Sequence, residues 1–259
     1  MSRAPQRSLG EILDELCLRP PGRDAYSNTE LAKLVRDLGG SITPGYLSLL
    51  RTSVRDNPTL EVLEYLAAVI DVSPAVFVGG RCERRGDEWP RRTFSKKLSR
   101  LFAVVYPAEH GPWTPEDAAA AITARATYGP ISPSYIRELL APPAGTLPNP
   151  RLKHVLGLAE QFGLSQDGSP HAAYFLDDDL AAVIDAELAD FVALRSAGVV
   201  EFVTRLAQHA TAWRPELRQQ VVQAFTQAID RGETDWVFRA PGERRRLHDP
   251  PPGRKGTET

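Results

Sequence analysis

The stretch Thr43–Arg51 decides the fold of this chain; it reads TPGYLSLLR and is followed by Asn57-Pro58. Thr43 can cap a helix that begins at Pro44, and the Leu and Tyr side chains fall on one side of that helix. The other side carries hydroxyl groups, a glycine and an arginine. A short helix with this polar face, preceded by a turn of small residues, suits insertion into the major groove of DNA.

A partial copy of this stretch occurs about 90 residues later. Ser132–Leu140 reads SPSYIRELL and is followed by Asn149-Pro150. The apolar positions around each copy predict five short helices in the same order, with a tight turn between the second and the third. That order is typical of a helix-turn-helix domain. The sequence therefore predicts an all-α fold with two such domains.

We expect five parts along the chain. In order, they are an N-terminal helix-turn-helix domain (1–79), a basic linker (80–93), a second, partly degenerate helix-turn-helix domain (94–177), a C-terminal helical dimerisation domain (178–231) and a disordered tail (232–259). If extended, the linker could span roughly 50 Å and hold the two domains apart. Pro, Gly and Arg dominate the tail, a composition that does not favour a packed core.

The charge of the chain is unevenly distributed. The 259 residues have a net charge of −2, which neither favours nor excludes a nucleic-acid partner. Residues 81–100, however, carry eight basic and three acidic side chains, whereas residues 177–230 carry four basic and nine acidic ones. This distribution is compatible with a DNA-facing centre and a C-terminal part that faces protein or solvent.

Cysteine usage and hydropathy predict the compartment. Cys17 and Cys82 are too few for a disulfide framework or a zinc module, which indicates a reducing environment. We find no signal-peptide pattern and no apolar run long enough to span a membrane. The expected location is therefore the cytoplasm, without membrane association.

We find no pattern typical of an enzyme. The five His residues form no metal-binding or catalytic arrangement, and Gly-rich phosphate loops and nucleophile elbows are lacking. Asp177–Asp179 does not fit a calcium loop, and acidic residues at the start of a helix explain it better. We expect no catalytic residues, no metal and no cofactor.

The chain resembles a known family in two places. Residues 94–231 resemble the mycobacterial EspR-type regulators, within the lambda-repressor-like (XRE) helix-turn-helix group. That resemblance rests on Tyr106-Pro107, Gly111-Pro112, Ser132–Ile136, Asn149-Pro150, Tyr174-Phe175 and Asp177-Asp178. Residues 8–79 resemble the DNA-binding domain of the same family independently. The resemblance implies two lambda-repressor-like domains, a C-terminal dimerisation domain and nucleoid-organising behaviour.

The two copies are not equivalent. Leu140 stands where the first copy has Arg51, and Pro142–Gly145 replaces the basic turn that holds Arg55. The loop of the second copy is also three residues longer. We therefore expect the first copy to supply most of the base recognition.

Candidate DNA-binding residues lie on the two short helices and in the turn after the first, with Thr43, Gly45, Ser48 and Thr52 expected on the outer face and Tyr46 on the core side. They are Thr43, Gly45, Tyr46, Ser48, Arg51, Thr52 and Arg55 in the first copy, and Ser132, Ser134 and Arg137 in the second. Arginine at these positions can bind guanine or phosphate. It is equally typical of an ordinary exposed helix end, where it complements the helix dipole.

Two further sets of residues carry predictions. Basic residues in and after the linker either follow the DNA backbone or serve only as a solubilising segment; they are Arg84, Arg85, Arg91, Arg92, Lys96 and Lys97. Apolar residues of the C-terminal region are expected to form a homodimer interface; they are Leu188, Phe191, Phe202, Leu206, Val221 and Phe225.

The leading hypothesis is a transcriptional regulator that binds double-stranded DNA with the third helix of its helix-turn-helix domains. The alternative is a regulatory module in which one or both domains bind protein, and the degenerate second copy favours it. An enzyme targeted by helix-turn-helix domains would require a catalytic cluster that the sequence does not show.

Overall fold

The computed structural model describes residues 7–20, 22–106, 110–166, 169–170 and 172–196. It divides into two units, residues 1–185 and 186–259. The described residues form ten α-helices, one 3₁₀-helix and one two-residue strand pair. The prediction of an all-α fold is confirmed.

The first five helices form what we call the N-terminal group. Its elements are α1 (Leu9–Leu18), α2 (Asn28–Asp37), α3 (Pro44–Arg51), α4 (Leu60–Ile70) and the 3₁₀-helix η1 (Pro74–Val78). Hydroxyl side chains that precede α1, α2, α3 and η1 accept a backbone N–H of the first turn, as N-cap residues do. Leucines from every α-helix meet in one core, including Leu13, Leu31, Leu47, Leu50 and Leu66.

The next helices form what we call the central group, in the same order. Its elements are α5 (Arg91–Val104), α6 (Pro115–Ala124), α7 (Pro133–Leu140), α8 (Leu152–Gln161) and α9 (Ala173–Leu176). Strands β1 (Ser165–Gln166) and β2 (Ser169–Pro170) form an antiparallel pair between α8 and α9. Thr114 and Ser132 cap α6 and α7, each directly before a proline at the start of the helix.

The last described helix is α10 (Asp178–Ser196). The carboxylate of Asp177 accepts the backbone N–H groups of Asp179 and Leu180 at 3.0 and 3.1 Å, so it caps this helix. The first unit ends within α10, at Asp185. The predicted tail and all of the predicted dimerisation domain after Ser196 lie outside the described residues.

The two groups pair through their Asn-Pro segments. Leu60 donates its backbone N–H to the carbonyl of Pro150, and Leu152 donates to that of Pro58, both at 2.8 Å. Thr59 and Arg151 face each other in this antiparallel bridge. Leu60 and Leu152 are equivalent residues, 92 positions apart, and so are Pro58 and Pro150. Each segment therefore donates to the other the same hydrogen bond that it accepts. This reciprocity is the pattern of an isologous, two-fold interface.

Each group also caps a helix of the other. Helices α4 and α8 have no side-chain cap of their own at Thr59 and Arg151. Instead, Oδ1 of Asn149 accepts the N–H of Glu61 in α4 at 3.0 Å. Oδ1 of Asn57 accepts the N–H of Lys153 in α8 at 2.9 Å. The two asparagines therefore replace the missing N-caps in trans.

The segment between the groups does not hold them apart. Ser73 donates its N–H to the carbonyl of Cys82, and Val72 pairs with Glu83, so the segment folds back on the N-terminal group. Arg81 then joins it to the end of the central group through Asp177, at 2.6 Å. The segment is therefore not extended, and its full reach of roughly 50 Å is not used.

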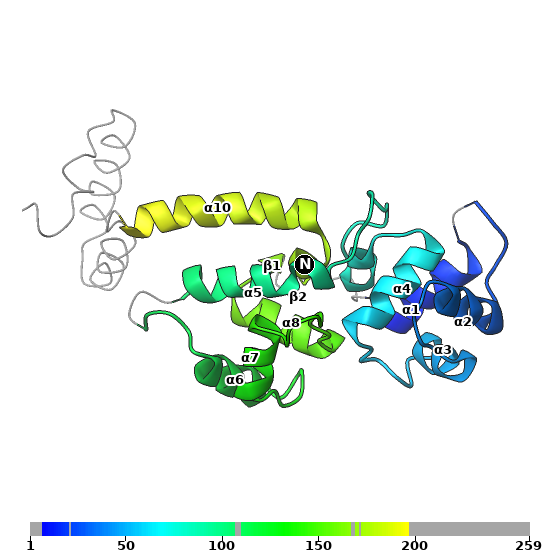
Figure 1. Cartoon of the computed structure of the whole chain (residues 1–259), viewed down its shortest axis with the longest axis horizontal. Helices are drawn as coiled ribbons and strands as arrows, with labels where there is room; N and C mark the ends of the chain where they lie inside the picture. The colour runs from blue at the N-terminus through cyan, green and yellow to red at the C-terminus, as the bar shows by residue number, and fades with distance from the viewer. Residues whose placement is uncertain (1–6, 21, 107–109, 167–168, 171, 197–259) are drawn as a thin grey trace, which may run out of the picture. The chain divides into compact units, whose positions relative to one another are not determined.

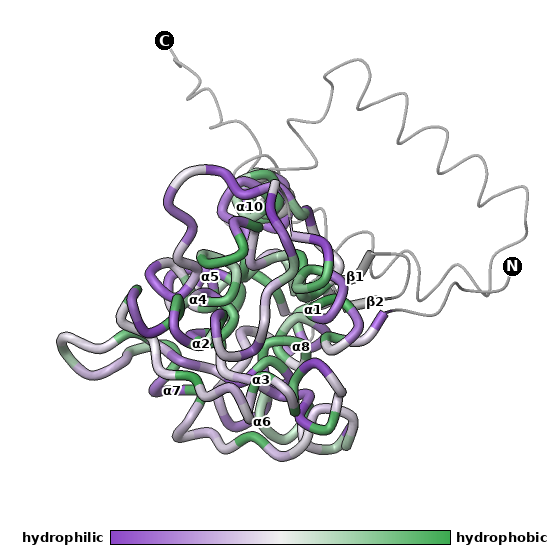
Figure 2. The backbone as a smooth tube through the Cα atoms, turned by 90° about the vertical axis from the view of Figure 1, so that its right-hand side faces the viewer, coloured by the Kyte–Doolittle hydropathy of each residue, from purple (hydrophilic) through white to green (hydrophobic). Residues whose placement is uncertain are grey.

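Helices α3 and α7 lie on the same side of the first unit. Figure 1 draws both on its lower side with α4 and α5 above them, and Figure 2, turned by 90°, places them in the same way. We call the exposed side chains of residues 43–55, 132–138 and 151 the α3–α7 face.

Candidate nucleic-acid interface

The outer side of α3 carries small and neutral residues. Leu47 and Leu50 are fully buried and Tyr46 is half-buried against the core, which turns the remaining positions to solvent. The exposed residues of α3 and of the turn after it are Thr43, Pro44, Gly45, Ser48, Leu49, Thr52, Ser53, Val54 and Arg55. Of these, the sequence analysis named Thr43, Gly45, Ser48, Thr52 and Arg55. It did not name Leu49, which is 38% exposed and offers an apolar contact of the kind that thymine methyl groups accept.

Two of these hydroxyl groups have partners within α3. Oγ1 of Thr43 accepts the N–H of Tyr46 at 3.2 Å, and Oγ1 of Thr52 donates to the carbonyl of Ser48 at 2.8 Å. Both side chains are nevertheless exposed, and each oxygen retains capacity for a further hydrogen bond.

Gly45 has no role in the packing of the protein. A Cβ at this position meets no atom within 4 Å, and the backbone does not have a positive φ. Glycine costs up to about 1 kcal/mol relative to alanine in a helix. The absence of a side chain on the exposed side of α3 therefore favours close approach of another molecule.

Arg51 lies elsewhere than the sequence predicted. Its guanidinium contacts the carboxylate of Asp14 in α1 and Oδ1 of Asn28 in α2, each at 2.8 Å. Only 16% of the side chain is exposed. Arg51 therefore joins α3 to α1 and α2 from the inner edge of the helix, and it is not part of the outer face.

Arg55 and Arg151 are exposed cations beside α3. Neither forms an ion pair within the described part of the chain. Both charges act on Tyr46: burial raises the pKa of its phenol, and Arg55 and Arg151 oppose that rise. Arg151 also acts on Tyr135 of α7, whose pKa is raised mainly by burial. Arg151, which the sequence analysis missed, therefore lies within electrostatic reach of both helices.

The outer side of α7 has a different chemistry. Ser132 accepts the N–H of Tyr135 at 3.2 Å, and its hydroxyl lies 3.1 Å from that of Ser134. Arg137 is exposed and forms an ion pair with Glu116 of α6. Glu138 is exposed beside it. The second copy thus presents a basic and an acidic side chain, Arg137 and Glu138, where α3 presents Ser48 and Leu49.

Most of the predicted linker cations have partners within the protein. Arg91 contacts Glu64 and Glu61 at 2.6 and 2.9 Å, Arg92 contacts Asp87 at 2.9 Å, and Arg85 contacts Asp179 at 3.3 Å. Arg84 donates to the carbonyls of Val72 and Glu88. Because these contacts are internal, the four arginines do not form a row of unpaired positive charges along the segment.

The two lysines of α5 differ from each other. Lys97 is buried, pairs with Asp178 at 2.7 Å, and has its pKa lowered by that burial despite the nearby carboxylates. It anchors the start of α10. Lys96 is exposed and has no ion pair among the described residues.

Most side chains of the predicted dimerisation residues lie outside the part of the chain that the structure describes. Leu188 is half-buried on α10, whereas Val183 and Val192 of the same helix are 59% and 38% exposed. The side chain of Phe191 lies outside the described residues, as do Phe202, Leu206, Val221 and Phe225.

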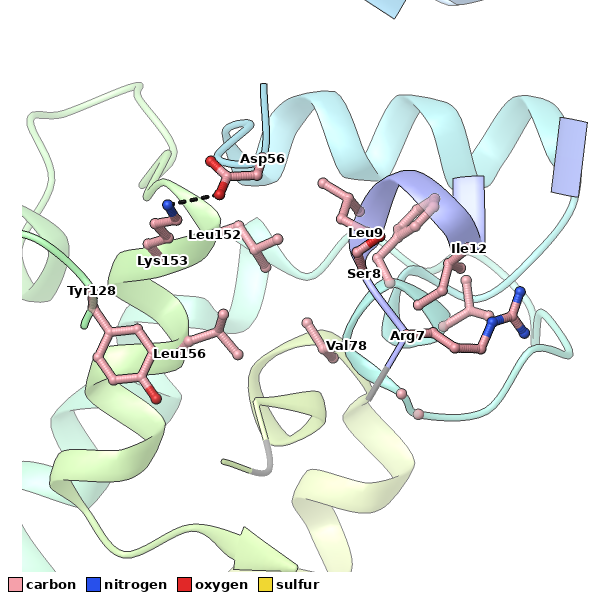
Figure 3. Close-up of a pocket in the computed structure, with 14 residues that line it drawn as sticks. Arg7, Ser8, Leu9, Ile12, Asp56, Val78, Tyr128, Leu152, Lys153 and Leu156 are labelled. Carbon is pink, nitrogen blue, oxygen red and sulfur yellow. Dashed lines mark ion pairs between the residues drawn. The ribbon is translucent and has the colours of Figure 1, made fainter. Parts of the chain in front are cut away.

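A cavity of about 700 Å³ lies between α1, η1 and α8. Leu9, Phe77, Leu152 and Leu156 contribute its apolar wall. Figure 3 shows Lys153 reaching Asp56 at its edge, where the two atoms are 2.8 Å apart. Among the described residues, no cluster of side chains is suited to a metal, and no helix has the length and apolar character to cross a membrane.

Comparison with known proteins gives the chain a family. No family model matches it. Over 130 residues it is 32% identical to a nucleoid-associated protein of Mycobacterium tuberculosis, a match that covers 50% of this chain and 87% of the relative. That relative is EspR, found with the same identity in strains CDC 1551 and H37Rv. The chain belongs to the EspR family.

Proposed function

We propose that this protein is a DNA-binding transcriptional regulator, and that it is nucleoid-associated as its relative EspR is named to be. It binds double-stranded DNA through the α3–α7 face, with α2 and α3 as a helix-turn-helix and α3 in the major groove. It acts without enzymatic activity in the bacterial cytoplasm.

The exposed side of α3 carries this proposal. Gly45 leaves room for a duplex, and Ser48 and Thr52 offer hydroxyl groups to base edges. Arg55 beside them is free of internal ion pairs among the described residues and suits a phosphate contact. In this proposal Arg51 holds α3 in position and does not read bases.

A homodimer through the C-terminal helical region is part of the proposal. Exposed Val183 and Val192 on α10 favour a contact between apolar helix faces. Such a dimer raises affinity for paired sites through avidity. Sedimentation of the full chain tests it, and a monomer at micromolar concentration would contradict it.

Salt dependence of binding tests the DNA contact. We expect the full chain to bind a duplex from its own promoter region, with an affinity that falls steeply as salt rises. Arg55→Ala should reduce the slope of log K against log salt by about one, because one phosphate contact is removed. Absence of salt-dependent binding by the unmodified chain would overturn the proposed function.

Arg85→Ala is the matched control. It removes one exposed arginine whose partner is Asp179, in a segment that Figure 1 draws on the upper side, away from α3 and α7. Its affinity and salt slope should equal those of the unmodified chain. A reduced slope in this variant would instead support the predicted contact between the linker and DNA.

The interaction module remains the second candidate. The feature that favours it is α7, where Arg137 is paired with Glu116 and Glu138 is an exposed acid. Variants of α7 that leave DNA affinity unchanged would favour a protein partner for that helix.

A further inference from the structure

The two groups of one chain are related in the way that two subunits of a dimer are. The bonds from Leu60 to Pro150 and from Leu152 to Pro58 are equal in length and opposite in direction. The side-chain caps supplied by Asn149 and Asn57 repeat this exchange. A local two-fold axis therefore passes between Thr59 and Arg151, the central pair of the bridge.

This axis relates α3 to α7. Equivalent positions have the same burial: Leu47 and Ile136 are fully buried, Tyr46 and Tyr135 are half-buried, and Gly45 and Ser134 are exposed. Both helices lie on one side of the unit in two perpendicular views (Figures 1 and 2). A dimeric helix-turn-helix protein needs this arrangement to reach two half-sites on one face of a duplex.

Arg151 lies at the axis, between the two helices. It lines one surface pocket together with Tyr46 and Arg55 of the N-terminal group. It lines another with Asn57, Tyr128 and His154. Its counterpart in the bridge, Thr59, is uncharged. Arg151 is therefore the member of this pair that places a positive charge at the axis.

We propose that a single chain binds a bipartite site as an intramolecular pseudo-dimer, with α3 in one major groove and α7 in the next. The proposal rests on the DNA-binding function above and extends it to the second copy. Half-sites read from one face of a duplex are about one helical turn apart, roughly 10 base pairs, and the minor groove faces the protein between them. Arg151 lies at that midpoint.

The two half-sites must differ in sequence. Helix α3 presents Ser48 and Leu49, whereas the equivalent positions of α7 are Arg137 and Glu138. A hydroxyl and an apolar side chain suit thymine-containing steps. Arg137 suits guanine when it exchanges its partner Glu116 for the base, and Glu138 suits the amino group of cytosine. One chain therefore reads a non-palindromic site, unlike a dimer of identical domains.

The first test uses matched charge insertions on the two helices. Duplexes selected by the unmodified full chain from a random pool serve as probes, and hydroxyl-radical footprinting reports protection. We expect two protected segments per bound chain, about one turn apart. Ser134→Glu should weaken binding roughly tenfold and remove protection from one segment only, because its carboxylate repels phosphate.

Ser134→Gln is the control for side-chain size and should weaken binding much less than Ser134→Glu does. Protection of a single segment by the unmodified chain would overturn the inference, and so would unchanged binding by Ser134→Glu. Either result leaves the proposed function intact, because binding through α3 alone persists. Loss of all salt-dependent binding by the unmodified chain would instead remove the proposed function itself.

The second test concerns Arg151 and the centre of the site. Central base pairs are replaced by inosine–cytosine or by guanine–cytosine, which differ only by the amino group in the minor groove. We expect the unmodified chain to prefer the inosine probe several-fold, and Arg151→Ala to abolish that preference. Arg85→Ala should keep it. Equal binding of both probes by the unmodified chain would contradict a central contact by Arg151.

Discussion

At the scale of the residue, Arg51 shows why a basic side chain on a short helix is ambiguous. It follows buried Leu50 and lies one helical turn after buried Leu47, so the helical period turns it toward α1 and α2. This direction could be predicted from the sequence. Its partners, Asp14 and Asn28, could not, because they depend on how three helices pack.

Arg51→Ala should mainly lower stability. It removes the ion pair with Asp14 and the hydrogen bond to Asn28, both partly open to water, at a cost of about 1 kcal/mol of unfolding free energy. Urea unfolding of the full chain measures this, and Arg55→Ala is the control that should unfold as the unmodified chain does. Lost DNA affinity in Arg51→Ala with unchanged stability would show that Arg51 contacts DNA after all.

The two cysteines should react very differently. Burial raises the pKa of Cys17 to about 11, an effect that nearby Arg51 only partly offsets, so its thiol stays protonated at pH 8. Cys82 is exposed. A thiol-specific chromogenic reagent should modify one cysteine of the native protein quickly and the second only after unfolding. Equal rates for both would contradict the packing around α1.

At the scale of the element, α4 and α8 depend on caps from outside their own group. The sequence shows an Asn-Pro motif after each short helix, at Asn57-Pro58 and Asn149-Pro150. That each asparagine caps the helix of the other copy follows only from the pairing of the two segments. Local sequence patterns do not encode such a long-range exchange.

Asn149→Ala should therefore destabilise a helix that is 88 positions away. We expect faster amide exchange at Glu61 and the next turn of α4, and a loss of roughly 1 kcal/mol in stability. Asn57→Ala should have the reciprocal effect on α8. If amide hydrogen exchange changed only within the group that carries the substitution, that result would argue against capping between the groups.

His154 should make the stability of the central group depend on pH. Burial lowers its pKa below 6.5, against a hydrogen bond with the backbone of Pro130, and Arg151 lowers it further. The folded chain then binds this proton less readily than the unfolded chain, so stability falls as pH decreases below about 6.5. His154→Gln should lose less stability over this window, as thermal melting can measure. Parallel pH profiles would contradict the assignment.

At the scale of the whole molecule, the sequence predicted the order of the helices but not how the two groups associate. The sequence predicts a basic linker at 80–93, whose arginines are candidates for contact with DNA or solvent. In the structure Glu61, Glu64 and Asp177 engage Arg91 and Arg81, and these acids are distant in sequence. Charge density alone therefore did not predict exposure.

The candidate site was predicted in part. Exposed positions of α3 and α7 follow from the period of the helix, because the buried Leu, Ile and Tyr positions fix the opposite side. Arg151 was missed because its position between the two helices arises from the pairing of the groups. A site built across two copies can be found only once their association is known.

The central claim is that the α3–α7 face binds DNA, and Gly45 tests it most directly. A Cβ at this position meets no atom within 4 Å, and a glutamate here lies at the start of a helix, where a negative charge is favourable. Gly45→Glu should therefore melt no lower than the unmodified chain. Its carboxylate would nevertheless face the phosphates of a duplex bound to α3.

The decisive measurement is duplex affinity, by fluorescence anisotropy, of Gly45→Glu beside the neutral variant Gly45→Gln. We predict that Gly45→Glu loses at least about tenfold in affinity at low salt, with a smaller loss for Gly45→Gln, and that both remain folded. Unchanged affinity of a folded Gly45→Glu would contradict the account, because no duplex could then lie against α3.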